Sequence, residues 1–159
     1  MKIMNKFQKK LANRKKDNKG FSLVELIIVI AIMAILVGIV GTQVIPYISK
    51  SKVAKDQQVL NSISTAAVAA YSENGATSNM TIDVFGAAPS DATQAKIQAD
   101  IKTASGYNDL AAFKKALGSD AGKNVTTVTV TFDSSTHKAT TSVTPVDSKY
   151  PIKDVEATL

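Results

Sequence analysis

The apolar positions of the chain fall into segments with different periodicities. From Leu26 to Gly41, sixteen consecutive residues carry no charged or strongly polar side chain. Adding Leu23, Val24 and residues 42–45 brings this segment to the roughly 20 residues that a membrane-spanning helix needs. Ile, Val and Leu occupy every face, so the predicted helix is not amphipathic and requires apolar surroundings on all sides.

After Pro46 the pattern changes to a single stripe, which predicts a one-sided soluble helix. Apolar residues recur every three to four positions. Most of the positions between them hold polar residues, which are expected to face solvent. Asn74-Gly75 supplies a left-handed helix end, so residues 23–73 are predicted to form one helix. The stripe consists of Ile48, Val53, Val59, Leu60, Ile63, Ala66, Ala67, Ala70 and Tyr71, and the polar group of Lys50, Lys52, Lys55, Asp56, Gln57 and Gln58.

Gly38, Gly41 and Pro46 are the predicted weak points of this helix. Each glycine costs up to about 1 kcal/mol of helix stability relative to Ala. Proline removes one backbone hydrogen bond and bends or loosens the helix around it. In a bilayer such residues serve helix packing, and simple tolerance within a membrane anchor is an equally good interpretation of the two glycines.

The remaining residues predict an α+β domain. Residues 75–91 are predicted to form a loop with a short extended piece at 80–85, followed by a helix over 92–104 that Ser90 or Asp91 caps. A second short helix is expected over 108–117. Residues 125–132 alternate apolar and Thr side chains, which predicts a half-buried strand, and 139–146 is its returning partner. Residues 150–159 are predicted to be an edge strand or a tail.

Charge is distributed very unevenly. Residues 1–20 contain eight of the 19 basic side chains and one of the 13 acidic ones, so the rest of the chain has eleven basic and twelve acidic side chains. Without the first twenty residues, no basic footprint for a phosphate backbone remains, and direct nucleic-acid binding is not expected. The chain has no cysteine, which excludes disulfides and thiolate metal sites.

Catalytic and metal-binding patterns are scarce, so no enzymatic activity, cofactor or metal is expected. His137 is the only histidine and lies in a predicted hairpin turn, where a solvated side chain is the ordinary outcome. Asp133, Ser134 and His137 are close in sequence but lack the oxyanion hole and the fold-assembled geometry of a triad. Five further carboxylates are expected to be solvated: Asp83, Asp91, Asp100, Asp109 and Asp120.

Glu25 is the exception, because it places a carboxylate inside the apolar segment. Such a group costs about 1–3 kcal/mol on membrane-insertion scales. One interpretation is that Glu25 reaches the membrane interface. In the other, cleavage after Gly20 creates an α-amino cation on Phe21, one helical turn away, which pairs with Glu25 of its own chain or of a neighbour. In apolar surroundings that ion pair would fix register, because an unpaired charge is costly.

The sequence Gly20-Phe21-Ser22-Leu23-Val24-Glu25, between a basic leader and an apolar helix, closely resembles the class III-type prepilin signal of type IV pilins and pseudopilins. The resemblance covers about the first fifty residues. It implies cleavage between Gly20 and Phe21 by a prepilin peptidase, N-methylation of Phe21, and engagement of an adjacent subunit's Phe21 amine by Glu25 during assembly. Many members close a C-terminal loop with a disulfide; the lack of cysteine favours a Gram-positive source, with the 125–146 hairpin holding that loop.

The resemblance implies a pilin-like organisation of the whole chain. Its parts are a cleaved cytoplasmic leader (1–20), the membrane-spanning and filament-core half of the helix (21–46), the amphipathic half (47–74), and a globular head with an αβ loop (75–122) and a hairpin plus tail (123–159). The expected partners are the prepilin peptidase/N-methyltransferase, the pilus assembly machinery, the membrane and further copies of the chain. Basic charge before the span orients the N-terminus to the cytoplasm and the C-terminus outward.

Three functions are consistent with these residues. The first is a structural subunit of an extracellular type IV pilus, which acts in adhesion, motility or surface interaction. The second is a pseudopilin of a type II secretion or competence DNA-uptake system, where a competence pilin is the case that would contact DNA. The third is an uncleaved membrane-anchored enzyme or binding protein, which predicts that Gly20 and Glu25 are dispensable.

Overall fold

The computed structural model describes residues 20–159. The leader predicted over residues 1–20 therefore lies outside the described residues except for Gly20. The described chain divides into two compact units, one ending at Val44 and the other spanning Ile45–Leu159.

Helical residues run from Leu23 to Glu73, as the apolar pattern predicts. They comprise α2 (Leu23–Ile39), the π-helical segment η2 (Val40–Val44) and α3 (Ile45–Glu73). Within residues 20–159 this is the one helix long and apolar enough to cross a membrane, by length and composition. The prediction of a long N-terminal helix is confirmed.

The helical winding changes where the predicted weak points lie, but the helix does not end there. Gly41 lies inside η2, and Pro46 is the second residue of α3. Proline cannot donate to the carbonyl four residues earlier, and a wider π turn is one way in which a helix accommodates its ring. The hydroxyl of Thr42 donates to the carbonyls of Gly38 (2.9 Å) and Ile39 (3.4 Å), so side-chain hydrogen bonds support the backbone at this point.

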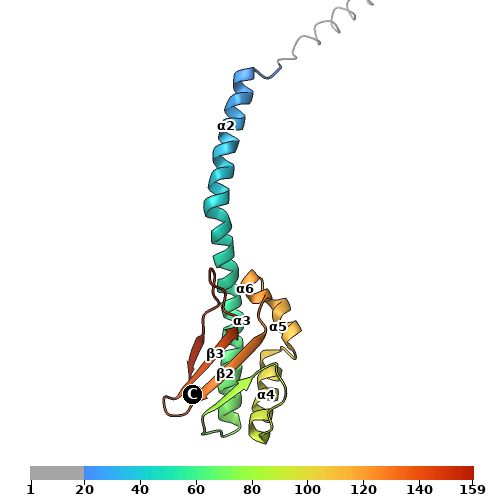
Figure 1. Ribbon diagram of the computed structural model, residues 1–159, viewed down its shortest axis with the longest axis vertical. Helices are drawn as coiled ribbons and strands as arrows, with labels where there is room; N and C mark the ends of the chain where they lie inside the picture. Colours follow the sequence, from blue (N-terminus) through green and yellow to red (C-terminus); the bar gives the residue numbers. More distant parts are fainter. Residues whose placement is uncertain (1–19) are drawn as a thin grey trace, which may run out of the picture. The chain divides into compact units, whose positions relative to one another are not determined.

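The head, residues 45–159, is α3 packed against an antiparallel sheet with three short helices (Figure 1). The sheet has the order β1-β2-β3-β4 and is antiparallel throughout. The α+β fold of the pilin type is therefore confirmed. The strands are β1 (Met80–Asp83), β2 (Thr127–Asp133), β3 (Lys138–Thr144) and β4 (Val155–Thr158), and the helices are α4 (Ala92–Ser105), α5 (Leu110–Ala116) and α6 (Asp120–Lys123).

Alternation along β2 places the core on one face of the sheet. Val128, Val130 and Phe132 are buried, whereas the Thr residues between them are partly or fully exposed. The Phe132 ring stacks on Tyr71 of α3 with a centroid distance of 4.7 Å. This face of the sheet therefore packs against the apolar stripe of α3. The period-two pattern of β2 predicts which of its side chains are buried there.

Asp56 departs from the predicted pattern, because it is fully buried on α3 rather than solvent-facing. Its carboxylate accepts hydrogen bonds from the backbone N–H of Gly118 (2.7 Å) and of Ser119 (3.0 Å), and from the Ser119 hydroxyl. A buried carboxylate needs such donors to offset its lost hydration. The prediction was wrong because these donors are 62 and 63 positions away in the sequence.

The C-terminal segment is held by α3 and β3. Gln57 donates to the Lys153 carbonyl (2.7 Å) and accepts from the Lys153 N–H (2.9 Å). Beyond it, β4 pairs with β3. The hairpin thus contributes to holding this segment, as expected, and Gln57 adds a contact that the sequence pattern did not reveal.

Several carboxylates that were expected to be merely solvated have local structural roles. Asp91 caps α4 by accepting from the Gln94 N–H (2.9 Å), and Asp109 caps α5 by accepting from the Ala112 N–H (2.7 Å). Asp100 accepts from the Asn74 side chain (2.8 Å). Asp83 accepts from the backbone N–H groups of Phe85 and Gly86. The bonds of Asp83, Asp91 and Asp109 are short-range and fix where helices and turns begin, whereas the bond of Asp100 joins α4 to the end of α3.

Candidate functional site

The predicted functional residues nearest the leader lie at the start of α2, which Ser22 caps. Ser22 is extended (φ −66°, ψ 142°), and its Oγ accepts a hydrogen bond from the Val24 N–H at 3.3 Å. The Ser22 carbonyl accepts from the Leu26 N–H at 3.1 Å. Gly20 and Phe21 therefore precede the helix, and the backbone becomes helical at Leu23.

Glu25 closes a capping box with Ser22. The backbone N–H of Ser22 donates to Glu25 Oε2 at 2.8 Å, and both halves of the box are present. A carboxylate in the first turn also interacts favourably with the positive end of the helix dipole. Sequence reasoning missed this role, although Ser22-Leu23-Val24-Glu25 fits the Ser-x-x-Glu pattern of a capping box.

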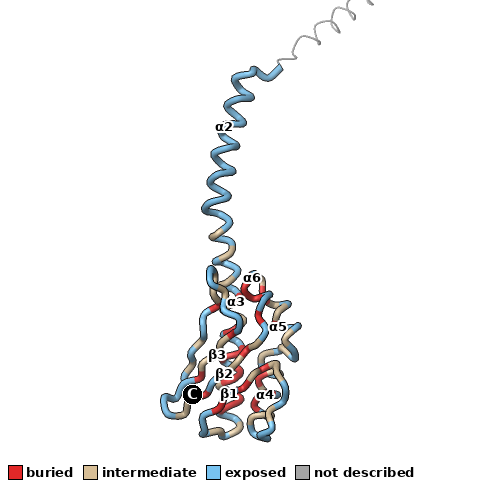
Figure 2. Tube along the Cα trace, viewed as in Figure 1, coloured by how far each residue is buried: buried red, intermediate tan, exposed pale blue. Residues whose placement is uncertain are grey.

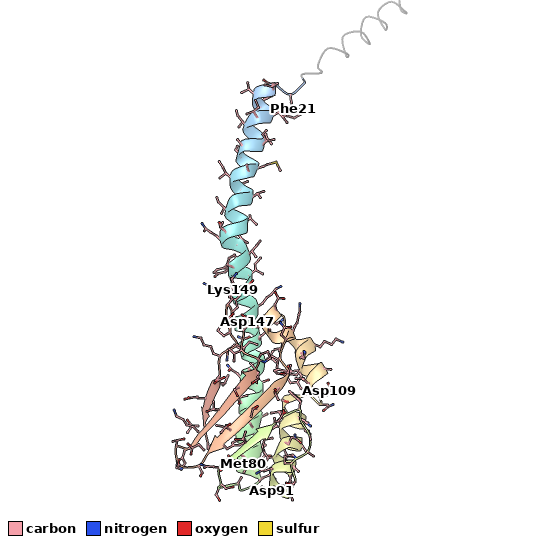
Figure 3. All side chains as sticks on the ribbon, in the orientation of Figure 1. Phe21, Met80, Asp91, Asp109, Asp147 and Lys149 are labelled. Atoms are coloured by element: carbon pink, nitrogen blue, oxygen red, sulfur yellow. The ribbon has the colours of Figure 1, made fainter. Side chains whose placement is uncertain are left out.

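Gly20, Phe21, Ser22 and Glu25 line one shallow hollow at this end of α2. The structure therefore brings the two residues of the predicted cleavage site next to the predicted assembly carboxylate. The side chain of Phe21 projects freely and is 91% exposed (Figure 3). Gly38, Gly41 and Pro46 lie further along the chain and do not line this hollow.

The surface that follows the hollow is apolar and uncovered. No residue of α2 is buried (Figure 2). Its apolar side chains are distributed around the whole helix. Ile, Val and Leu side chains along it are about half exposed or more; Ile30, for example, is 57% exposed. Such a surface needs an apolar environment around its whole circumference, either lipid or other helices.

The hairpin turn does not assemble Asp133, Ser134 and His137 into a catalytic cluster. The Ser134 hydroxyl donates to Asn79 Oδ1 (2.7 Å), and Asp133 Oδ1 accepts from the Ser135 hydroxyl (2.6 Å). His137 is exposed in the turn and has a left-handed φ of 55°. Ser134 and Asp133 therefore hydrogen-bond to Asn79 and Ser135 and do not form a triad with His137. Within the same described part, no group of three or more His, Asp or Glu residues could hold a metal ion.

Residues 15–41 match the family model described as the prokaryotic N-terminal methylation motif. The match covers the end of the leader, the hollow and all of α2, and it does not extend to the head. The chain therefore carries a type IV pilin-like prepilin signal, of the kind that implies processing by a prepilin peptidase. No curated protein matches the chain, and no solved structure matches it.

Proposed function

We propose, from the prepilin signal that residues 15–41 carry, that this chain is a structural subunit of an extracellular type IV pilus. A prepilin peptidase cuts the bond between Gly20 and Phe21, the new Phe21 amine is methylated, and the mature chains polymerise. The single observation that carries the proposal is the combination of this signal with an α2 that has no buried residue. The role is structural rather than enzymatic.

The uncovered surface of α2 supports two successive environments. In the precursor, lipid surrounds the helix, and the chain is a single-pass membrane protein. Basic residues of the leader keep the N-terminus in the cytoplasm, so the head lies outside. In the filament, identical helices replace the lipid, and packing rather than hydrophobic transfer decides the association. An all-round apolar helix suits both states because neither one presents a polar side.

The hollow at the start of α2 supports the pairing proposed for Glu25. Hydrolysis of the Gly20–Phe21 amide leaves a carboxylate on Gly20 and an ammonium group on Phe21, within the hollow that Glu25 also lines. Glu25 Oε2 already accepts from Ser22; a carboxylate has further acceptor capacity on both oxygens. We assign this capacity to the Phe21 ammonium group of an adjacent subunit, which would fix the stagger between subunits because an unpaired charge in apolar surroundings is costly.

The decisive experiment is co-expression of the full chain with a prepilin peptidase/N-methyltransferase, followed by intact-mass and N-terminal analysis. The expected product begins at Phe21 and carries an added methyl group. A product that still begins at Met1, or one cut after Ile45, would exclude the pilin function and favour an uncleaved membrane-anchored protein.

Glu25→Ala tests the assembly role separately from processing. We expect the variant to be cut between Gly20 and Phe21 while its incorporation into filaments falls at least about tenfold, the cost of leaving one charge unpaired. Glu25→Gln is the matched control, because it keeps an acceptor for the Ser22 N–H and removes only the charge. Wild-type filament yield in either variant would remove the register role of the carboxylate.

Fibre length distinguishes a pilus subunit from a pseudopilin, because both kinds of protein carry the same signal. Expression in a host with a complete assembly system is expected to give long surface fibres that contain the head, visible by electron microscopy with a label on the head. Cleaved and membrane-retained chains without such fibres would instead assign the chain to a secretion or DNA-uptake system.

A further inference from the structure

The bond that the proposed peptidase cuts lies at the point where an extended segment becomes a helix. Leu23 is the first helical residue, and Ser22 is extended. In an α-helix that began one turn earlier, the Gly20 carbonyl would accept the backbone N–H four residues later, that of Val24. The carbonyl to be attacked would then be tied into the helix.

Ser22 prevents that bond by taking its donor. The Val24 N–H points to Ser22 Oγ at 3.3 Å, so the donor that would hold the Gly20 carbonyl is already occupied. Glu25 Oε2 accepts the N–H of Ser22 itself at 2.8 Å, but it does not occupy the Val24 donor. The Ser22 half of the capping box is therefore the part that opposes extension of the helix towards Gly20.

We infer that Ser22 is a positioning residue for cleavage: its side chain keeps the Gly20–Phe21 bond outside the membrane helix, with the Gly20 carbonyl free for the peptidase. This inference rests on the proposed prepilin function. In the hydrolysis, water adds to the Gly20 carbonyl carbon, the C–N bond to Phe21 breaks, and the leaving nitrogen takes a proton. A carbonyl that is not hydrogen-bonded within a helix is open to that attack and to the donors that stabilise the developing oxyanion.

A cap is needed because a long apolar helix begins two residues after Phe21. The Phe21 side chain is itself apolar and is 91% exposed in the described chain. In apolar surroundings, a helix tends to extend over neighbouring residues because unpaired backbone groups are costly there. A capping residue at 22 opposes this extension because it satisfies the first backbone donors without further helical turns.

The test is a matched pair of variants, Ser22→Thr and Ser22→Val. The two new side chains have nearly the same shape, but only Thr has an oxygen that can cap the helix. With purified peptidase and full-length chain in micelles, we expect kcat/KM for Ser22→Thr to stay within about twofold of wild type. For Ser22→Val we expect a fall of about fivefold, the population shift that loss of a typical N-cap produces. Ser22→Asp, another good capping residue, is expected to restore cleavage.

A spectroscopic readout on the uncut chain accompanies the kinetics. In Ser22→Val, the backbone chemical shifts of Gly20 and Phe21 are expected to move towards helical values. In Ser22→Thr, the shifts of the same two residues are expected to keep values typical of an extended backbone. Equal rates for all variants would overturn the inference and leave the proposed function intact. Equally slow cleavage of Ser22→Thr and Ser22→Val would also overturn the inference, since such a result would indicate a steric effect at position 22. A wild-type chain that is not cut at all would instead refute the proposed function.

Discussion

The helix ahead of Ile45 and the head use the same apolar residue types in opposite ways. Ile30 in α2 is 57% exposed, whereas Ile63 in α3 is fully buried. The head satisfies its apolar side chains within one chain, against the sheet and α4 (Figures 1 and 2). In contrast, no residue of α2 is buried within residues 20–159. Hydrophobicity alone therefore does not identify a core, whereas the periodicity of the apolar residues does.

The sharpest test of this comparison makes one substitution in both regions. Ile63→Ala is expected to lower the free energy of unfolding by about 2–5 kcal/mol, because it leaves a cavity in the core. Ile30→Ala should change it by less than about 0.5 kcal/mol, since the side chain is largely exposed in the described part of the chain. Denaturant unfolding of the full-length protein in micelles, followed by near-UV circular dichroism, measures both. Equal losses would contradict the division into an intramolecular core and an intermolecular surface.

Asp56 tests the polar contacts of the head. Asp56→Ala removes the acceptor of three hydrogen bonds and leaves the N–H groups of Gly118 and Ser119 without it. We expect a loss of about 3 kcal/mol of unfolding free energy, as for a buried charged acceptor. Hydrogen exchange at the same two amides should also accelerate.

The matched control for Asp56 is Asp120→Ala, because the Asp120 side chain is 98% exposed. Its unfolding free energy is expected to stay within about 0.5 kcal/mol of wild type. Similar losses of unfolding free energy in the two variants would contradict the role of the buried Asp56 carboxylate in holding the segment ahead of α6 against α3.

Glycine substitutions should have opposite signs in the two regions. Gly106 ends α4 with a left-handed φ of 78°, so Gly106→Ala is expected to cost about 1 kcal/mol. Gly38 lies within α2, and a Cβ there would meet nothing within 4 Å. Gly38→Ala should therefore favour the helix by up to about 1 kcal/mol. Unfolding of the head and hydrogen exchange along α2 measure these effects.

Filament yield then decides between the two interpretations of Gly38. If Gly38→Ala leaves the yield unchanged, the glycine is merely tolerated in the anchor. A reduced yield together with a more stable α2 would assign it to close packing between helices.

The smallest expected effect concerns the hairpin turn between β2 and β3. Hydrogen bonds from the side chains of Ser135 and Thr136 lower the pKa of Asp133 from 3.8 to about 2. Because the folded pKa is depressed, the resulting stabilisation is fully present above about pH 4 and is lost as the pH falls through about 2. The effect on stability is small because Asp133 is in contact with solvent.

An NMR titration of the Asp133 carboxyl group measures this directly. Ser135→Ala is expected to raise its pKa towards 3.8, since it removes the largest of the contributing hydrogen bonds. An unchanged midpoint in that variant would show that the turn, and not the Ser135 hydroxyl, sets the acidity.

Local pattern was sufficient for much of the fold. The α4 helix, its Asp91 cap, the alternation of β2 and the long helix from Leu23 to Glu73 all depend on neighbours within a few residues. Such features are encoded by periodicity and capping preference. The capping box of Ser22 and Glu25 belongs to the same class, and it was missed although its signal was present in the sequence.

Other features depended on residues that are distant in sequence. Residues 80–83 fall within the extended piece predicted at 80–85, but local pattern did not reveal that this piece pairs with β2 some fifty residues later. Asp56 and Gln57 look like ordinary polar residues of a helix surface, yet they bind segments that begin more than 60 positions away. Pairing and burial of this kind require knowledge of which surfaces meet.

By itself, the sequence determined the prepilin signal, the apolar character of α2 on every face and the α+β class of the head, because each follows from residue type and spacing along a short stretch. Only the tertiary structure decided that Asp56 is buried, that β1 completes the sheet, and that Gln57 holds the C-terminal segment. The physical reason is that a polar side chain can be buried wherever the fold supplies donors to it, and those donors come from parts of the chain that no local pattern connects.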